Sequence, residues 1–345
     1  MERKLKTRAA LVAFGVIALI LPLLVRQPYH RTILVFIGIN AVAVVGLNLL
    51  MGYAGQVSLG HAAFAGIGGY ASAILTVHHG ANPWLAIAAG MATASAVAWL
   101  IGIPTLRLRG HYLAIATLGF GMIVSIVFVE WRQLTGGVGG IPGVPPLRIA
   151  GVALDTHLRF YYLAWACLYA ALAATANISD SRAGRALRAI RGSELAAQTT
   201  GINTGRYKLE VFVLSAALAA LAGSLFVHYI SFASTSRFGF GYSIELVVMA
   251  VLGGLGNVWG PVVGAGVITT LGELLAATGA WLQNTDLPLK AGDIDVPAFG
   301  LILVLVLILL PRGITTSLAA LAQRLLAPRR EPEAAASDAA GGGGA

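Results

Sequence analysis

The sequence predicts an all-α polytopic membrane protein with about ten transmembrane helices. Of its 345 residues, 57% are hydrophobic and only 11% are charged, whereas a soluble domain carries about 25% charged residues. Several apolar runs reach the roughly 20 residues that a helix needs to cross a bilayer. These observations exclude an ordinary soluble enzyme, and the high hydrophobicity excludes a disordered chain.

Each predicted span is an apolar run bounded by charged or turn-forming residues. The first run follows four basic residues, as in a secretory signal, but Val25 is not followed by a small-residue cleavage site, so we expect this span to be retained. A Gly/Pro-rich break at 253–261 divides 240–279, which predicts two spans or a broken, re-entrant pair. The predicted spans are 9–25, 32–51, 58–77, 84–103, 111–130, 160–176, 209–230, 240–253, 261–279 and 298–311.

The basic residues predict the orientation of these spans. They gather at the N-terminus, at Arg107 and Arg109, in 177–208 and after residue 311. Four, two and four predicted spans separate these segments, so all four lie on one side, which the positive-inside rule makes cytoplasmic. Both termini are therefore expected in the cytoplasm. The net charge of +9 is thereby assigned to membrane orientation, and we expect no nucleic-acid partner.

The sequence divides into a transmembrane domain at 1–311, which includes the cytoplasmic loop 177–208, and a cytoplasmic tail at 312–345. The Gly-rich end of the tail is expected to be disordered. After Glu2 the next acidic residue is Glu130, so the first third of the chain has no carboxylate pair for acid–base chemistry. Cys167 is the single cysteine, which excludes an internal disulfide or a cysteine metal cluster. We expect no catalytic residue, no metal and no cofactor.

The loop 177–208 carries the most informative local pattern. Ser193 is a residue type that caps a helix start, and Gly201 can end that helix in a left-handed conformation. The pattern predicts a short helix of small residues within a basic loop. Such a helix suits close approach by another protein; alternatively, the loop is a solvated amphipathic segment held by anionic lipid headgroups.

Two glycine-rich segments, 52–57 and 253–258, resemble each other. Glycine interruptions at matching points in two halves are how transporters build broken helices around a central site. Polar residues at membrane depth tend to face a cavity or a neighbouring helix, whereas the glycines alone are explained equally by close helix packing. The candidate residues for a translocation path are Asn48, Gln56, Ser58, His61 and the intramembrane Glu273.

Five segments in order resemble the permease subunit of branched-chain amino acid ABC transporters. In this sequence they read LNLLMGYAGQVSLGHAAF at 47–64, LRLRG with YLAI at 106–115, TGGVGGIPG at 135–143, GRALRAIR at 184–191 and VLGGLGNVWGP at 251–261. The resemblance covers about 40–270 and implies the ABC importer permease fold in a bacterial inner membrane.

The resemblance also implies a division of labour between subunits. In such importers a binding protein captures the substrate outside, two homologous permeases form the path, and two ATPases drive alternating access. Glu194–Gly201 resembles the EAA loop, which docks on the ATPase, although Leu195 intervenes between the glutamate and the alanine pair. Carried over, the coupling role falls on Glu194, Ala196, Ala197 and Gly201, with Arg188 and Arg191 on the approach.

The sequence contains no G-x-x-x-x-G-K-[ST] motif, so ATP hydrolysis is expected on a separate subunit. The expected function is therefore a permease subunit of an ATP-driven importer for branched-chain or related amino acids. Two alternatives remain at this point: a permease of the same family for urea or short amides, and an ion-coupled secondary transporter that uses Glu273.

Overall fold

The structure is a computed structural model of the chain. It describes residues 2–283 except residues 26, 109 and 150, together with 300, 313–315 and 317. The predicted span at 298–311 therefore lies outside the described residues but for residue 300, as does nearly all of the predicted tail.

Long helices make up most of the described chain, and short helices and two-residue strands connect them. In chain order the elements are α1 (Glu2–Leu24), α2 (Pro28–Asn48), the π-helical turn η1 (Leu49–Tyr53), α3 (His61–Val77), α4 (Pro83–Thr105), α5 (His111–Glu130), α6 (Arg132–Thr135), η2 (Gly137–Gly139), β1 (Ile141–Pro142), β2 (Arg148–Ile149), β3 (Val152–Ala153), α7 (His157–Asp180), α8 (Arg182–Gly192), α9 (Glu194–Thr199), α10 (Thr204–Ile230), β4 (Phe232–Ala233), η3 (Ser236–Phe238), α11 (Phe240–Gly253) and α12 (Gly260–Gln283).

Each span predicted between residues 9 and 279 coincides with one of the long helices. Among the described residues, five helices are long and apolar enough to cross a membrane by length and composition. Boundaries differ where a polar cap extends a helix beyond its apolar run. The predicted span 209–230, for example, begins at Thr204 because the Asn203 side chain accepts a hydrogen bond from the amide of Arg206 at 3.1 Å.

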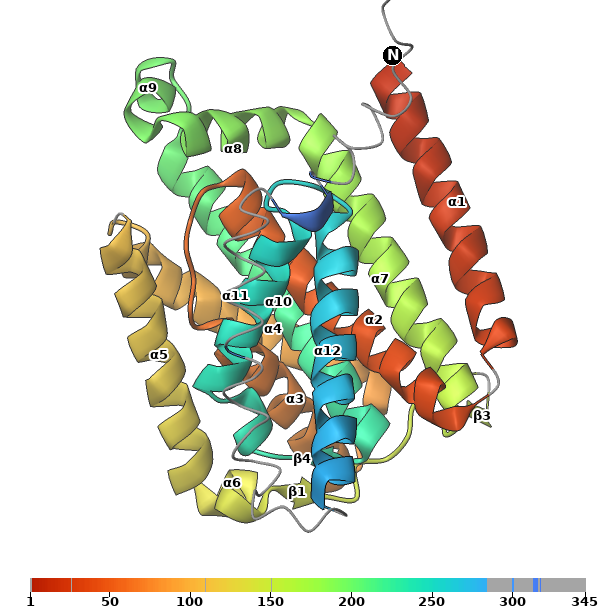
Figure 1. The fold of residues 1–345 in the computed structure, drawn as a ribbon. Coiled ribbons are helices and arrows are strands. Elements are labelled where there is room, and N and C mark those ends of the chain that lie inside the picture. The colour runs from red at the N-terminus through yellow and green to blue at the C-terminus, as the bar shows by residue number, and fades with distance from the viewer. Residues whose placement is uncertain are drawn as a thin grey trace, which may run out of the picture.

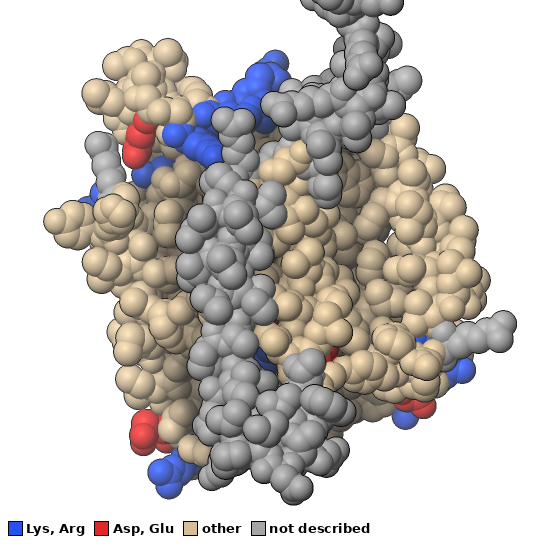
Figure 2. All heavy atoms as spheres, viewed as in Figure 1, with Lys and Arg blue, Asp and Glu red and all other residues tan. Residues whose placement is uncertain are grey.

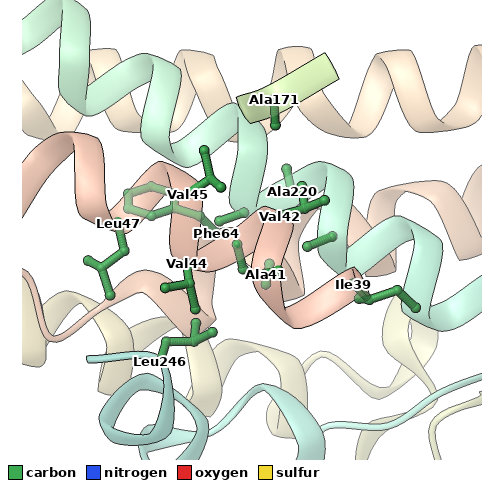
Figure 3. Packing of buried hydrophobic residues seen from close by; sticks show 14 of the residues in the cluster. Ile39, Ala41, Val42, Val44, Val45, Leu47, Phe64, Ala171, Ala220 and Leu246 are labelled. Carbon is green, nitrogen blue, oxygen red and sulfur yellow. The ribbon is translucent and has the colours of Figure 1, made fainter. Parts of the chain in front are cut away.

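The core lies along α2, α3 and α10, which pack at the centre of the bundle (Figure 1). The valines and the leucine of α2 at residues 42–47 are fully buried and point toward several neighbouring helices (Figure 3). Small residues bring α3 and α10 close together: a Cβ added at Gly68 would overlap the backbone of Ala220, and one at Gly223 would overlap the backbone of Ala65. This is the small-residue packing typical of membrane helices.

The outer helices α1, α4 and α5 expose apolar side chains. On α5 alone, Tyr112, Ile115, Met122 and Ile123 are each more than half exposed. An apolar surface of this kind suits contact with lipid or with a second membrane subunit.

The two ends of the bundle differ in charge. Helices α8 and α9 lie at the same end as the start of α1 (Figure 1), and Figure 2 shows Lys and Arg gathered over α8 there. At the opposite end, acidic and basic side chains lie together, and the two small sheets β1–β4 and β2–β3 form part of the cap. The end that carries α8 and α9 is called the basic end below.

Residues 240–279 form two separate helices and not one kinked helix. Helices α11 and α12 are antiparallel, because Gly253 packs on Gly260 and Met249 packs on Gly264. The connection between them turns through Gly254 at φ 109° and Gly256 at φ 79°, a conformation that favours glycine.

Candidate functional site

Helix α9 is defined by residues at its two ends. At the start, the Ser193 side chain accepts a hydrogen bond from the amide of Ala196 at 3.3 Å. At the end, Gly201 has φ 81°, and the amide of Ile202 returns to the carbonyl of Ala197 at 3.1 Å. The space around the Gly201 α-carbon is open, so any penalty for a side chain there arises from the backbone conformation.

A buried ion pair ties α9 to the first turns of α10. Lys208 Nζ lies 2.8 Å from Glu194 Oε1, and the two side chains are 2% and 19% exposed. Thr204 strengthens the connection, since its hydroxyl lies 3.4 Å from Glu194 Oε1 and accepts a hydrogen bond from Gln198 Nε2 at 2.9 Å. The sequence did not identify Lys208 as the partner of Glu194, because the two residues are 14 positions apart on different helices.

One face of α9 remains open to the surroundings. Ala197 is buried, whereas Ala196 and Leu195 are exposed, and Leu195 is 67% exposed. Leu195, which interrupts the expected motif, is therefore an apolar side chain on the outer face of the helix. An exposed leucine beside an alanine suits insertion into a groove on another protein.

Two concave surfaces lie close to α9. A cavity of about 650 Å³ is lined by three arginines, Arg182, Arg185 and Arg206. A second cavity of about 680 Å³ lies beside Glu194 and Lys208. Both cavities border Gly201, just after α9, so the basic end presents a short helix beside two hollows that a partner protein can contact.

Helix α8 lies across the basic end and packs its apolar side inward. Leu187 and Ile190 are buried, while Arg182 and Arg185 face outward. Arg188, in the second half of α8, ties this helix to the end of α7, since its Nη1 donates to the carbonyl of Ser179 at 2.8 Å. Arg188 is therefore a local brace within the loop.

Arg191 extends from the end of α8 to a neighbouring turn of the bundle. Its guanidinium donates a hydrogen bond to the carbonyl of Gly52, in the π-helical turn η1. Its stem passes over Gly55, where an added Cβ would lie 3.2 Å from Arg191 Cγ. On the other side an added Cβ at Gly256 would lie 2.8 Å from Arg191 Nη1. One arginine thus contacts both glycine-rich breaks.

The Asn48 side chain also connects the same two glycine-rich breaks. Its Nδ2 donates to the carbonyl of Asn257 at 2.8 Å, and its Oδ1 accepts from the amide of Gly256 at 2.9 Å. Asn48 is completely buried, and Gly52 has no room for a side chain because Asn48 and Gly256 occupy that space. The two segments that resemble each other in sequence therefore pack against each other, and Asn48 and Arg191 connect them.

The other predicted path residues do not form one cluster. Ser58 Oγ and His61 Nδ1 lie 3.2 Å apart in a buried pair, and Gln56 donates to the carbonyl of Ala54 at 3.3 Å. Glu273 lies elsewhere, on α12, where it accepts a hydrogen bond from the Tyr29 hydroxyl at 3.1 Å. Asn48 meets the glycine breaks, whereas Glu273 borders a different cavity.

Comparisons with known proteins find a family model and relatives that are described as transport permeases. The family model described as "Branched-chain amino acid transport system / permease component" matches residues 29–311. The high-affinity branched-chain amino acid transport system permease protein LivM of Escherichia coli K12 is 33% identical over 253 residues, which are 67% of this chain and 60% of LivM. The matched region thus spans less than two thirds of that relative.

Two further relatives are similar over more of their own length. The permease protein LivH of the same branched-chain amino acid system in Escherichia coli K12 is 30% identical over 79% of this chain and 90% of LivH. The ribose import permease protein RbsC of Escherichia coli K12 is 29% identical over 70% of this chain and 75% of RbsC. No solved structure matches the chain.

Proposed function

The chain belongs to the family of branched-chain amino acid transport permeases, and we propose that it is a transmembrane subunit of an ATP-driven importer for branched-chain or related amino acids. Its helices make it a multi-pass membrane protein. We assign α8 and α9 to the cytoplasmic side of the inner membrane, together with both termini, because basic residues gather at that end.

The observation that carries this proposal is the connection from α9 to the two glycine breaks. Helix α9 offers Leu195 and Ala196 to a partner, and the Glu194–Lys208 pair fixes it to α10. Arg191 then joins the end of α8 to Gly52, and the guanidinium also lies beside Gly256. A push on α9 therefore reaches α2 and the α11–α12 turn through contacts between packed groups.

In the proposed mechanism, ATPase subunits bind the outer face of α9 and move it as a rigid body. Interfaces of packed helices switch between discrete arrangements, so the motion of α8 and α9 shifts the helices that meet at the glycine breaks. Glycines at Gly52 and Gly256 suit such a junction because the backbones there touch directly. The result is alternating access along the permease interface.

The proposed assembly contains four further kinds of component. They are a second homologous permease, two ATPases, an extracytoplasmic substrate-binding protein and the surrounding lipid. The relatives LivM and LivH are described as permease proteins of the same transport system, which supports a paired permease. The exposed apolar surface of α5 is available for such a contact or for lipid.

A pair of glycine substitutions tests the coupling role. Gly201→Val places a β-branched residue at φ 81°, a left-handed conformation that glycine adopts at much lower energy than other residues. Gly192→Val is the matched control, because Gly192 ends α8 in the same loop with open space around it. In proteoliposomes containing the complete transporter, we expect Gly201→Val to lower uptake by about tenfold while ATP hydrolysis continues.

Gly192→Val should keep at least half of the wild-type uptake. Equal uptake by the two variants, each confirmed to reach the membrane in normal amount, would contradict a coupling role for α9.

A further inference from the structure

A second polar site lies away from the glycine breaks. A cavity of about 250 Å³ opens between α2, α10, α11 and α12, and Phe36, Asn40, Phe226, Arg237, Glu245 and Glu273 are among its lining residues. Glu273 stands about 20 Å along α12 from the basic end, at 1.5 Å per residue. Tyr29, which bonds it, is in the first turn of α2 at the opposite end. The cavity therefore lies beyond the middle of the bundle, toward the extracytoplasmic side in the proposed orientation.

Arg237 is held over this cavity without being fully paired. Its guanidinium carbon lies 4.4 Å from the centre of the Tyr242 ring and 4.9 Å from that of Phe226, so the rings fix its position. Its ion pair with Glu245 is loose, at 3.8 Å. Within the described part of the chain, the Arg237 guanidinium makes no hydrogen bond. A guanidinium fixed by stacking, with N–H donors to spare, suits bidentate binding of a carboxylate.

Two carboxylates supply the opposite charge. Glu245 is 27% exposed and has only the loose contact with Arg237, and Glu273 accepts only the Tyr29 hydroxyl among the described residues. Asn40, in contrast, is bonded at both ends of its amide: it donates to Thr269 at 3.0 Å and accepts from Tyr242 at 3.0 Å. Asn40 thus connects α2 to α11 and α12 around the cavity, while the two carboxylates can still accept hydrogen bonds from an ammonium group.

The remaining wall is apolar. Phe36, Phe226 and Ile268 line the cavity beside the charged groups. A cavity of 150 Å³ holds a benzene-sized molecule, and pockets for drug-sized ligands start at about 300 Å³. The volume of about 250 Å³ therefore matches a small metabolite with one compact apolar group.

We propose that this cavity is a substrate site that binds a free α-amino acid with an apolar side chain. The carboxylate binds Arg237, the ammonium lies between Glu245 and Glu273, and the side chain packs on Phe36 and Phe226. The inference rests on the proposed transport function and makes it more specific. Urea or a short amide carries no charge and could form no ion pair with Arg237, Glu245 or Glu273, which would keep, among the described residues, only the loose Arg237–Glu245 contact and the Tyr29 hydrogen bond.

Direct binding of tritiated L-leucine to the assembled transporter tests the site. The transporter is purified with its ATPases but without the binding protein, so that the binding protein does not contribute to selection. We expect Arg237→Gln and Glu273→Gln each to raise the dissociation constant by about tenfold or more, as for the loss of a hydrogen bond to a charged group. Glu273→Gln retains an oxygen for the Tyr29 hydroxyl, which protects the fold.

Arg159→Gln is the matched control, because this arginine pairs with Asp155 on the surface, outside the cavity. It should bind leucine as the wild type does. Leucinamide and 4-methylpentanoate, which lack one charge each, should compete at least tenfold more weakly than leucine, and acetamide should not compete.

Three results would overturn the site. The first is no saturable leucine binding to the wild type, and the second is unchanged leucine affinity in Arg237→Gln. The third is wild-type affinity in the double variant Arg237→Glu/Glu245→Arg, which would show that the ion pair has only a structural role. Recovery of the ATPases in the same samples tests the transport assignment separately, so failure of the site does not imply failure of the function.

Discussion

Glu194 and Lys208 lie 2.8 Å apart at the basic end, and the lysine is almost completely buried. Glu245 and Arg237 lie 3.8 Å apart beside the cavity, and both remain more than a quarter exposed. The first pair is closed by a short contact and by Thr204. The second pair makes no hydrogen bond within the described residues. The difference indicates that charges at the basic end hold a rigid connection together, whereas charges at the cavity stay available to a ligand.

The same difference extends to the neighbouring arginines. Arg188 and Arg191 both donate hydrogen bonds to backbone carbonyls, those of Ser179 and Gly52. The Arg237 guanidinium stacks on aromatic rings, which orient it but, within the described chain, leave its N–H donors free to bind a ligand. A region that transmits motion needs arginines that are hydrogen-bonded to the backbone, whereas a region that binds and releases a ligand needs an arginine whose donors are free.

The largest expected effect on stability comes from removing the carboxylate of the ion pair at the basic end, and the matching change at the cavity should have a smaller effect. Glu194→Ala leaves Lys208 buried without its carboxylate and should destabilise the protein by about 3 kcal/mol, near the lower end of the range for broken buried pairs. Glu245→Ala should cost about 1 kcal/mol or less, because Arg237 remains partly hydrated and stacked. The thermal stability of the detergent-purified protein measures both.

Glu210→Ala is the surface control. Glu210 pairs with Arg206 at 2.7 Å, and both side chains are more than half exposed, so we expect a change of about 0.5 kcal/mol or less. If Glu194→Ala behaved like Glu210→Ala, the basic end would not be held by its ion pair and the contrast with the cavity would fail.

A smaller effect on stability, but a specific one on transport, is expected for Arg191. Arg191→Ala removes the hydrogen bond to Gly52 while leaving the apolar face of α8 packed. We expect uptake to fall by about tenfold with ATP hydrolysis retained, as for the loss of coupling between sites. Arg159→Ala removes a surface arginine at the opposite end of the bundle, where it pairs with Asp155, and should transport normally. Parallel assays of uptake and ATP hydrolysis in proteoliposomes separate the two variants, and loss of both activities in Arg191→Ala would contradict a coupling role.

The sequence predicted the local features of the structure well because they depend on neighbouring residues. Apolar runs located the helices, Ser193 and Gly201 marked the ends of α9, and the break at 253–261 separated α11 from α12. The similar segments 52–57 and 253–258 were expected around a central site, whereas Arg191 of α8 contacts both of them at the basic end.

The sequence did not predict the contacts that join distant segments. Arg191 and Gly52 are 139 positions apart, and the sequence placed Arg191 on the approach to the coupling helix together with Arg188, without indicating a contact to Gly52. Arg237 lies in a short connection between spans and reads as an ordinary interfacial charge until Phe226 and Tyr242 are placed beneath it. Such contacts depend on helix packing, which hydrophobic periodicity does not specify.

The most direct test of the transport assignment is purification of the tagged chain from native membranes in mild detergent, with its partners identified by mass. We predict recovery of a second permease and of P-loop ATPases. Leu195→Asp puts a charge on the exposed face of α9 and should reduce the recovered ATPase by about tenfold. Val138→Asp, at another highly exposed apolar position at the opposite end, should not. Recovery of the chain alone, with uptake in liposomes driven by an ion gradient, would contradict the account and favour a transporter that uses Glu273.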